Sequence, residues 1–335
     1  MPSPEQDTRD LTVVTGAGGH IGGNLVRALR GRGRRLRLVV RQDRRAIAGI
    51  EAEVLQGDVL DLEFLRRAFS GADVVYHLAA NISIIGEQNG LVRRVNVEGP
   101  RNVVEACLGC GVRRLVHFSS IHAFAQEPLD QVLDETRGQV DGHAPAYDRS
   151  KAAGEREVLA GVGRGLDAVI VNPTGVIGPL DFKGSRMGSV LLGMALRRFI
   201  SLVDGGFNWV DVRDVCDGAM AAEERGRTGE RYLLSGHWRS LRDLARVVEA
   251  VSGARAPRFD APMWLARVGA PFVTAWSQLT RTQPLYTSEA LVALRANRSI
   301  SHGKASVELG YTPRPIEVSI ADTLRWFRER GELPS

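Results

Sequence analysis

The chain has 335 residues, of which 44% are hydrophobic and 25% are charged, as in an ordinary globular protein with one large domain and a smaller companion. The formal net charge of +5 comes mostly from scattered arginines. The chain has no dense basic run with interleaved aromatics, so nucleic-acid binding is not expected. No apolar stretch of the sequence reaches the roughly 18 residues that a membrane span needs. The nearest candidate, 263–276, is shorter and carries Arg267, so a buried helix is the better interpretation.

The three cysteines, Cys107, Cys110 and Cys216, are too few for a disulfide framework and fit a reducing, cytoplasmic location. Cys107 and Cys110 have the spacing of metal ligands. No second pair of ligands follows at the distance of a zinc finger, however, and both cysteines lie in an apolar helical pattern. We therefore predict no metal site. The polar segment 1–10 lacks the features of a signal peptide.

The first half of the chain alternates apolar strands with amphipathic helices. The pattern predicts strands at 11–15, 36–40, 73–78, 115–119 and 168–171, and helices at 21–29, 62–69, 92–110 and 147–159. Strands that alternate with helices and read as continuous apolar runs form parallel sheets that are covered on both faces. Because such crossovers are right-handed, we predict an α/β fold with a Rossmann-type doubly wound parallel sheet.

After residue 180 the pattern becomes less regular. Segments 209–222 and 230–234 are predicted to return to the sheet, and helices are predicted at 241–251, 262–279, 288–294 and 316–330. We therefore expect residues 1–180, joined by 207–235, to form a dinucleotide-binding domain. Residues 181–206 and 236–335 are expected to form a smaller, mostly helical cap that binds substrate at the carboxyl edge of the sheet.

Three glycines lie between the first strand and the first helix. Gly16, Gly19 and Gly22 fit a G-x-x-G-x-x-G spacing, whereas G-x-G-x-x-G fits badly because its third glycine would fall on Ile21. Glycine lets the backbone approach a pyrophosphate, whose charge is stabilised at a helix N-terminus. This segment is therefore predicted to bind a dinucleotide, and His20 and Ile21 are expected to contribute contacts from the start of the helix.

Arg41 ends the second strand, where NAD-binding folds carry an acidic residue against the ribose hydroxyls. A guanidinium would pair with a 2′-phosphate, so NADP(H) is predicted in preference to NAD(H), with Arg44 or Arg45 as helpers. Asp58, which Val59 follows, comes after the expected third strand. It is expected either to accept a hydrogen bond from the adenine amino group or to serve as a loop or cap residue.

The sharpest signal is the pair Tyr147 and Lys151, which are four residues apart and share one helix face. A phenol near pKa 10 is a poor acid–base catalyst at neutral pH, and an ammonium one helical turn away can stabilise its phenolate. Ser119 and Ser120 end a strand at the edge that faces the ligand crevice, where a hydroxyl can bind a substrate carbonyl. The small residues after the preceding strand would let a nicotinamide ribose lie close; this stretch comprises Leu78, Ala79 and Ala80.

In this order, the motifs resemble those of extended short-chain dehydrogenases/reductases, and segments 172–179, 208–215 and 306–326 extend the resemblance over nearly the whole chain. The resemblance implies that Tyr147 is the general acid/base and that Lys151 lowers its pKa and holds the nicotinamide ribose. It also implies that Ser120 polarises the substrate oxygen and that Asn96 is mainly structural. Further cofactor contacts are implied for Pro173 and Val176. Many relatives are homodimers that pair the helices equivalent to 97–110 and 148–159, so a homodimer is expected.

Arg41 and the apolar segment 81–86 favour the branch of dihydroflavonol reductases and 3β-hydroxysteroid dehydrogenases. Ile121 and His122 stand where dehydratases carry an Asp-Glu pair. We expect an oxidoreductase that transfers a hydride between NADP(H) and a carbonyl or secondary alcohol of an apolar or aromatic small molecule. The alternatives are a nucleotide-sugar epimerase, dehydratase or reductase, and a non-catalytic NADP-binding sensor. Substrate contacts are expected from Ser83, His122 and Asn208, although a lone loop histidine often serves only as polar packing.

Overall fold

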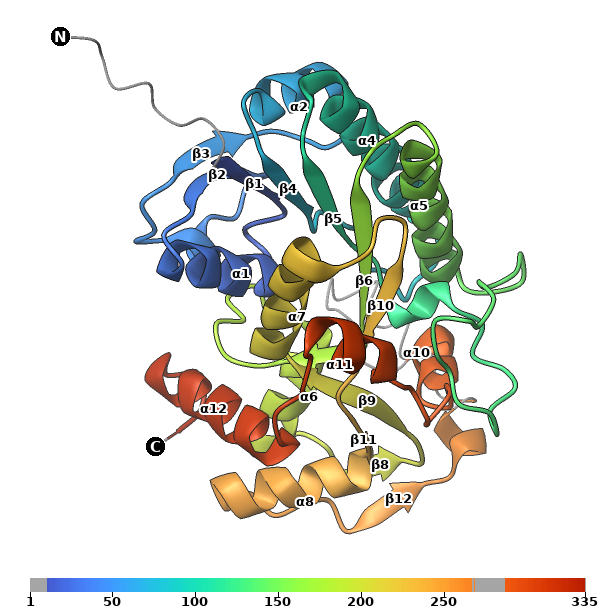
Figure 1. The fold of residues 1–335 in the computed structure, drawn as a ribbon. Coiled ribbons are helices and arrows are strands. Elements are labelled where there is room, and N and C mark those ends of the chain that lie inside the picture. Colours follow the sequence, from blue (N-terminus) through green and yellow to red (C-terminus); the bar gives the residue numbers. More distant parts are fainter. Residues whose placement is uncertain (1–10, 267, 269–286, 335) are drawn as a thin grey trace, which may run out of the picture.

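The computed structural model describes residues 11–266, 268 and 287–334, and its centre is a seven-stranded sheet (Figure 1). The strand order is β10-β6-β5-β4-β1-β2-β3, and every neighbouring pair is parallel. The strands are β1 (Leu11–Thr15), β2 (Arg35–Val40), β3 (Glu53–Gln56), β4 (Val74–His77), β5 (Arg114–Phe118), β6 (Ala168–Pro173) and β10 (Arg231–Leu234). The run 3-2-1-4-5-6 is the order of a doubly wound Rossmann sheet, which confirms the predicted fold class.

Helices cover both faces of this sheet. One face carries α1 (His20–Gly31), α7 (Val212–Arg225) and α11 (Gly303–Leu309), and the other carries α2 (Leu62–Phe69), α4 (Gly99–Cys110) and α5 (Ala146–Val162). Successive strand residues point to opposite faces, so Val13 packs against the second set of helices and Val14 against the first. Both side chains are fully buried, which explains why the strands read as continuous apolar runs.

The helix predicted over 92–110 is divided into three parts. A short α3 (Leu91–Arg93) leads into a π-helical turn, η3 (Arg94–Glu98), before α4 begins. Pro100, in the first turn of α4, has no N–H to donate to the preceding turn. Single π turns inside helices are frequent at functional sites. This turn contains the buried Asn96, which contacts the segment that carries Tyr147, as described below.

The smaller part of the molecule lies below the carboxyl edge of the large sheet in Figure 1. Its buried core includes Leu191, Trp209, Leu244 and Phe327. A three-stranded sheet runs through it, with β9 (Gly206–Asp211) between β7 (Gly175–Ile177) and β11 (His237–Ser240). The other elements are α6 (Arg186–Ala195), β8 (Ser201–Val203), α8 (Leu241–Ser252), β12 (Phe259–Ala261), α10 (Ser288–Ala293) and α12 (Ile316–Glu329).

Two boundaries drawn from the sequence need correction. Residues 207–235 were expected to return to the large sheet, but only α7 and β10 do so, whereas β9 pairs with β7 and β11. The reason is that β9 lies between two cores: Trp209 packs in the cap core and Val210 in the sheet core. In addition, α11, which was assigned to the cap, packs on α7 and β10 of the large domain.

The helix predicted at 262–279 begins within the described residues, where 263–266 and 268 are helical. The remainder of that prediction lies outside the described residues. Among the described helices, none has the length and apolarity to cross a membrane.

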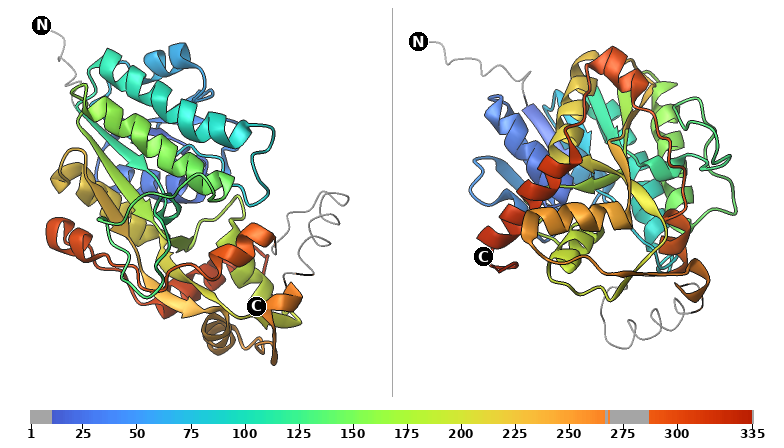
Figure 2. Two further views of the ribbon diagram at one scale, coloured as in Figure 1. Left: turned by 90° about the vertical axis from the view of Figure 1, so that its right-hand side faces the viewer. Right: turned by 90° about the horizontal axis from the view of Figure 1, so that it is seen from below.

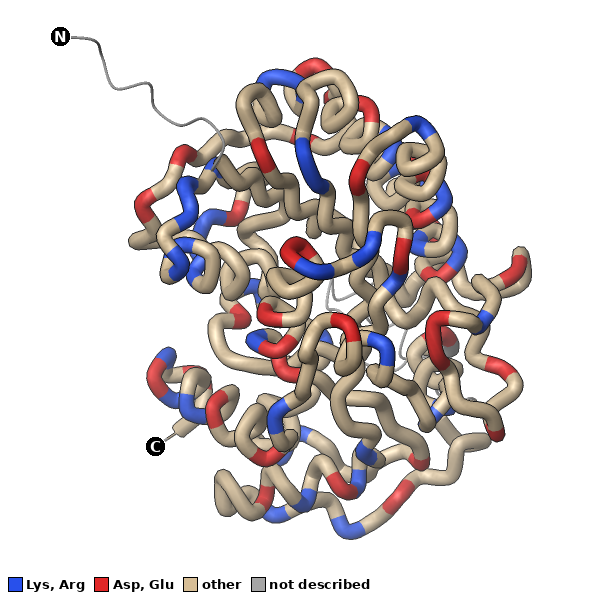
Figure 3. Tube along the Cα trace, viewed as in Figure 1, with Lys and Arg blue, Asp and Glu red and all other residues tan. Residues whose placement is uncertain are grey.

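Figure 2 shows α4 and α5 lying side by side on one face of the sheet. Acidic and basic residues are interspersed along the chain trace in Figure 3, and many form ion pairs, such as that between Arg227 and Glu308 at 2.7 Å.

Candidate active site

The glycine-rich loop leads from β1 into α1 and lies close to the backbone that follows β4. Gly16 has a φ of +73°, and a Cβ there would lie 2.7 Å from the backbone nitrogen of Ala79, so only glycine fits. The N-cap of α1, Gly19, makes no side-chain capping bond, and the first turn carries no acidic residue. The first N–H groups of the helix therefore have no side-chain acceptor of their own, which fits a pyrophosphate. The His20 ring itself contacts the carbonyl of Pro179 at 3.1 Å, so only its backbone is offered to this site.

Arg41 follows β2 directly and is exposed. It makes no hydrogen bond or ion pair with another described residue, so its guanidinium is available to a ligand. Its predicted helpers are engaged elsewhere: Arg45 pairs with Asp43 at 2.7 Å, and Arg44 donates to the Gln56 side chain at 3.3 Å. Of the three arginines, Arg41 is thus the one without a partner among the described residues.

Asp58 uses one carboxylate oxygen to accept the backbone N–H of Leu60 at 3.0 Å, as a loop residue does. Of the two roles expected for Asp58, this contact supports the loop role. Val59 beside it is buried against the helices of the second face. Around the same edge, Leu78 and Ala79 are partly buried and Ala80 is exposed. On the other side, Pro173 ends β6 and Val176 lies in β7. The predicted cofactor residues therefore line the carboxyl ends of β1, β2, β4 and β6, where open α/β sheets bind their ligands.

Tyr147 lies in the first turn of α5 and is partly exposed. Burial and the charge of Asp148 raise the pKa of its phenol to about 12, although hydrogen bonding with the Ser120 hydroxyl opposes them. Burial therefore dominates the pKa of this phenol, and the expected lowering of that pKa by Lys151 stays a prediction. At neutral pH the phenol is protonated and able to donate a proton.

Lys151 lies one turn further along α5, is buried, and donates from Nζ to the carbonyl oxygen of Phe118 at 2.8 Å. Burial lowers the pKa of its ammonium to about 8, and the charge of Glu155 opposes this. The group therefore stays mostly charged at neutral pH. The backbone carbonyl of β5 fixes the position of this cation beside the sheet edge.

A buried carboxylate beneath these residues escaped the sequence analysis. Glu155 is fully buried and accepts hydrogen bonds from Asn172 at 2.6 Å, Gln139 at 2.9 Å and Arg231 at 2.7 Å. Asn172 also donates to the carbonyl oxygen of Ser120 at 3.0 Å, so this network fixes the backbone of the candidate serine. The signal was available, since residues 147, 151 and 155 repeat every four positions on one helix face.

Asn96 joins three segments around Tyr147. Its amide accepts from the backbone N–H of Asn81 at 2.8 Å and donates to the carbonyl of Asn81 and to the Ser150 hydroxyl, each at 2.9 Å. Ser150 in turn donates to the carbonyl oxygen of Tyr147 at 2.6 Å. These bonds hold the 81–90 loop and the start of α5 together, which fits the structural role that the resemblance implied.

Two of the three expected substrate residues have other partners. Ser83 is buried, donates to the carbonyl of Gly86 at 2.8 Å and stabilises its own loop. Asn208 is buried, accepts from Thr174 at 2.9 Å and from the backbone N–H of Gly236 at 2.8 Å, and so joins neighbouring cap segments. Both side chains therefore have structural roles, and their expected substrate contacts stay predictions. His122 lies beside Tyr147, with ring centroids 5.8 Å apart.

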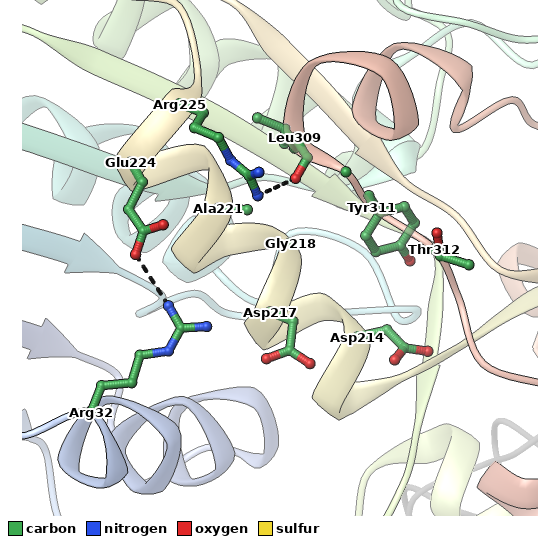
Figure 4. A pocket seen from close by; sticks show the side chains of 11 residues that line it. Arg32, Asp214, Asp217, Gly218, Ala221, Glu224, Arg225, Leu309, Tyr311 and Thr312 are labelled. Carbon is green, nitrogen blue, oxygen red and sulfur yellow. Dashed lines mark hydrogen bonds and ion pairs between the residues drawn. The ribbon is translucent and has the colours of Figure 1, made fainter.

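A hollow of about 270 Å³ lies elsewhere, between α1, α7 and the segment after α11, and none of the predicted site residues lines it (Figure 4). Its charged side chains have partners: Arg32 pairs with Glu224 at 3.2 Å, and Asp214 pairs with Arg314 at 2.7 Å. We interpret this hollow as part of the contact between the large domain and the C-terminal segment. Within the described part of the chain, no group of three or more His, Cys, Asp or Glu residues could hold a metal ion.

The chain is similar to several known proteins over most of its length. The model of the NAD dependent epimerase/dehydratase family matches residues 12–235. The chain is 34% identical to sterol demethylase protein B of Methylococcus capsulatus, covering 96% of this chain and 99% of that protein. It is 30% identical to a 4-hydroxy-2-methyl-3-oxo-4-farnesyl-3,4-dihydroquinoline-1-oxide ketoreductase of Stigmatella aurantiaca, with coverages of 96% and 97%. A solved nucleoside-diphosphate-sugar epimerase from Pseudomonas aeruginosa superposes with a TM-score of 0.77 at 27% identity, covering 96% of this chain and 99% of that one.

Proposed function

Because this chain belongs to the NAD dependent epimerase/dehydratase family and is an extended short-chain dehydrogenase/reductase, we propose that it is an NADP(H)-dependent oxidoreductase that reduces the carbonyl group of an apolar or aromatic substrate. Family members use nicotinamide dinucleotide cofactors. In this proposal Tyr147 is the general acid, Ser120 binds the substrate oxygen, and Lys151 holds the nicotinamide ribose. The reverse oxidation uses the same groups with Tyr147 as base.

The observation that carries the proposal is the arrangement of Tyr147 and Lys151 on consecutive turns of α5, with Lys151 bonded to the end of β5, which Ser120 follows. A pKa of about 12 means that Tyr147 holds its proton at neutral pH and can release it to an oxygen that gains negative charge. The nicotinamide, when bound, supplies the hydride that joins the carbonyl carbon. The electron pair of the C=O bond then goes to oxygen, which takes the proton from Tyr147. Ser120 polarises the same oxygen by a hydrogen bond.

Arg41 supports NADP(H) as the cofactor. It is exposed at the end of β2 and lacks a partner among the described residues, whereas a carboxylate at this position would favour ribose hydroxyls. A guanidinium pairs strongly with phosphate, often through two hydrogen bonds. NAD(H) remains the alternative cofactor.

Apolar residues support the substrate class. Ile82 and Ile85 are 61% and 47% exposed in the loop that Asn96 joins to the start of α5. Exposed isoleucines in a loop tied to the start of α5 suit an apolar substrate better than a sugar. The names of the two relatives, a sterol demethylase protein and a ketoreductase of a farnesylated ring, point the same way.

A nucleotide-sugar epimerase is the second candidate, and the similarity to the Pseudomonas aeruginosa epimerase favours it.

We also propose that the protein works as a cytoplasmic homodimer that pairs α4 and α5. These helices pack together and are joined by an ion pair of 2.8 Å between Arg101 and Glu157.

The test measures NADPH consumption by the purified protein with a panel of apolar ketones. Separately, chromatography of the products measures the conversion of nucleotide sugars, because epimerisation leaves the cofactor unchanged overall. We expect turnover of ketones with NADPH and none of the sugars. Turnover of the sugars alone would establish the second candidate. Tight NADP(H) binding without turnover of any compound would overturn the enzymatic function and leave a cofactor-binding sensor.

A further inference from the structure

A histidine–carboxylate pair lies beside the reactive phenol. His122 belongs to η4 (Ile121–Ala123), the short turn that follows β5 and Ser120. Its Nδ1 lies 3.3 Å from a carboxylate oxygen of Asp148, the residue after Tyr147 on α5. Its ring meets the ring of Tyr147 edge-on, with centroids 5.8 Å apart. The imidazole is therefore oriented by a residue adjacent to the general acid.

Backbone and side chain both fix this histidine. The backbone N–H of His122 donates to the Ser120 hydroxyl oxygen at 3.2 Å, which ties the turn to the group that would bind a carbonyl. Asp148 occupies Nδ1. The other ring nitrogen, Nε2, makes no hydrogen bond to another described residue, and 31% of the side chain is exposed. A ring nitrogen that is held in place but has no partner can bind a ligand.

The charges around His122 favour a ring that donates from Nε2. Burial lowers the pKa of His122, but the hydrogen bond and charge of Asp148 outweigh it and raise the pKa above its ordinary value. Glu289 of α10 interacts with Asp148, and Arg186 of α6 and Arg149 of α5 partly balance Glu289. Because the carboxylate of Asp148 already contacts this ring and Glu289 interacts with Asp148, a neutral oxygen suits the Nε2–H better than a further carboxylate would.

We propose that the Asp148–His122 pair binds a second, neutral oxygen of the substrate next to the carbonyl, so that the preferred substrates are 1,3-dicarbonyl compounds such as 3-oxo esters. The inference rests on the proposed function and narrows its substrate class. Tyr147 and Ser120 bind the oxygen of the carbonyl that is reduced, and His122 binds the second, neutral oxygen. A site that offers a hydrogen-bond donor discriminates against analogues that lack the acceptor, because the donor is then left without a partner.

The experiment compares methyl 3-oxooctanoate with 2-heptanone, which is the same ketone without the ester group. A 3-oxo ester is intrinsically more electrophilic, so the wild-type preference alone decides nothing. The informative quantity is the change in the ratio of the two kcat/KM values on substitution. We expect His122→Gln to lower kcat/KM for the ester by roughly tenfold, mainly through KM, and to leave that for 2-heptanone within about twofold.

Asp148→Asn keeps the imidazole and removes the charge that orients it. We expect a smaller loss for the ester, and a pH dependence of its KM whose midpoint moves to lower pH, since removal of the carboxylate lowers the pKa of His122. His143→Gln, in an exposed loop before α5, is the matched control and should leave kcat/KM unchanged for both substrates. If His122→Gln fails to bind NADPH, the Asp148→Asn profile decides alone.

Equal loss for both substrates, or no loss for either, would overturn the inference while leaving the proposed function intact. A larger loss with sodium 3-oxooctanoate than with the ester would also overturn it, because the pair would then bind a carboxylate. No turnover of any of these compounds by the wild-type enzyme would instead count against the proposed ketone reductase.

Discussion

The ammonium of Lys151 donates a hydrogen bond to the carbonyl oxygen of Phe118 at 2.8 Å, which fixes a buried cation at the end of β5. Burial lowers the pKa of this lysine to about 8, so its charge is lost as the pH rises through that value. We predict that kcat/KM falls above about pH 8, because kcat/KM reports the free enzyme. Lys151→Met should be slow at every pH, without that midpoint. An unchanged fall in Lys151→Met would assign the midpoint to another group.

Gly16 and Gly33 offer a matched test of the glycine-rich loop. Both have positive φ, at +73° and +77°, so alanine strains both backbones similarly. A Cβ at Gly16 would meet the backbone of Ala79, whereas a Cβ at Gly33 meets nothing within 4 Å. We predict that Gly16→Ala loses NADPH binding in a fluorescence titration and that Gly33→Ala keeps it. Equal binding by the two variants would show that the loop does not hold the dinucleotide.

Arg41 should control cofactor choice. Arg41→Ala removes the one guanidinium of its cluster that has no described partner, so we predict that KM for NADPH rises at least roughly tenfold while KM for NADH changes little. Arg45→Ala is the control, since that arginine already pairs with Asp43. Steady-state kinetics with both cofactors measure the effect. A wild-type preference for NADH would refute the assignment.

Stability at acid pH should depend on two buried histidines behind the site. The rings of His77 and His117 stack 5.3 Å apart, and burial together with the charge of Lys151 lowers both pKa values, that of His77 to about 3. The folded state therefore binds fewer protons than the unfolded state below about pH 6.5, so these groups lower the free energy of unfolding as the pH falls from there toward 3.

His117→Phe tests this dependence with little other cost, since neither ring nitrogen of His117 has a hydrogen-bond partner among the described residues. Between pH 6.5 and 5, the free energy of unfolding should fall less steeply with falling pH in the variant than in the wild type. The two slopes should differ by up to about 1.4 kcal/mol per pH unit. Urea denaturation at several pH values measures the difference. Parallel pH profiles would mean that His117 is protonated in the folded protein.

The sequence was sufficient to predict a feature where all the residues that define it lie in one short segment. The glycine-rich loop, the strands of the large sheet and the pair Tyr147 and Lys151 each depend on residues only a few positions apart. The short cap strands could not be predicted, because three to six residues carry little periodic pattern and β9 faces two cores. Nor could the contact between His122 and Asp148, which the fold brings together from separate elements.

The direction of the pKa of Tyr147 shows the same limit in the site. Its spacing from Lys151 correctly predicted a shared helix face, but the pKa depends on burial and on Asp148, which spacing alone does not reveal. The hydrogen bonds of Ser83 and Asn208 could not be predicted from the sequence for a related reason. Their sequence positions border the site, yet their side chains are used by the surrounding backbone.

The central claim is that Tyr147 supplies the proton in a hydride-transfer reaction, and Tyr147→Phe tests it most directly. The measurement is kcat/KM for NADPH-dependent reduction of methyl 3-oxooctanoate by wild type and variant, alongside NADPH titrations of both. We predict a loss of roughly 10²–10⁴-fold in kcat/KM with NADPH affinity changed by less than about threefold. A variant that keeps activity within about threefold of the wild type would contradict the account.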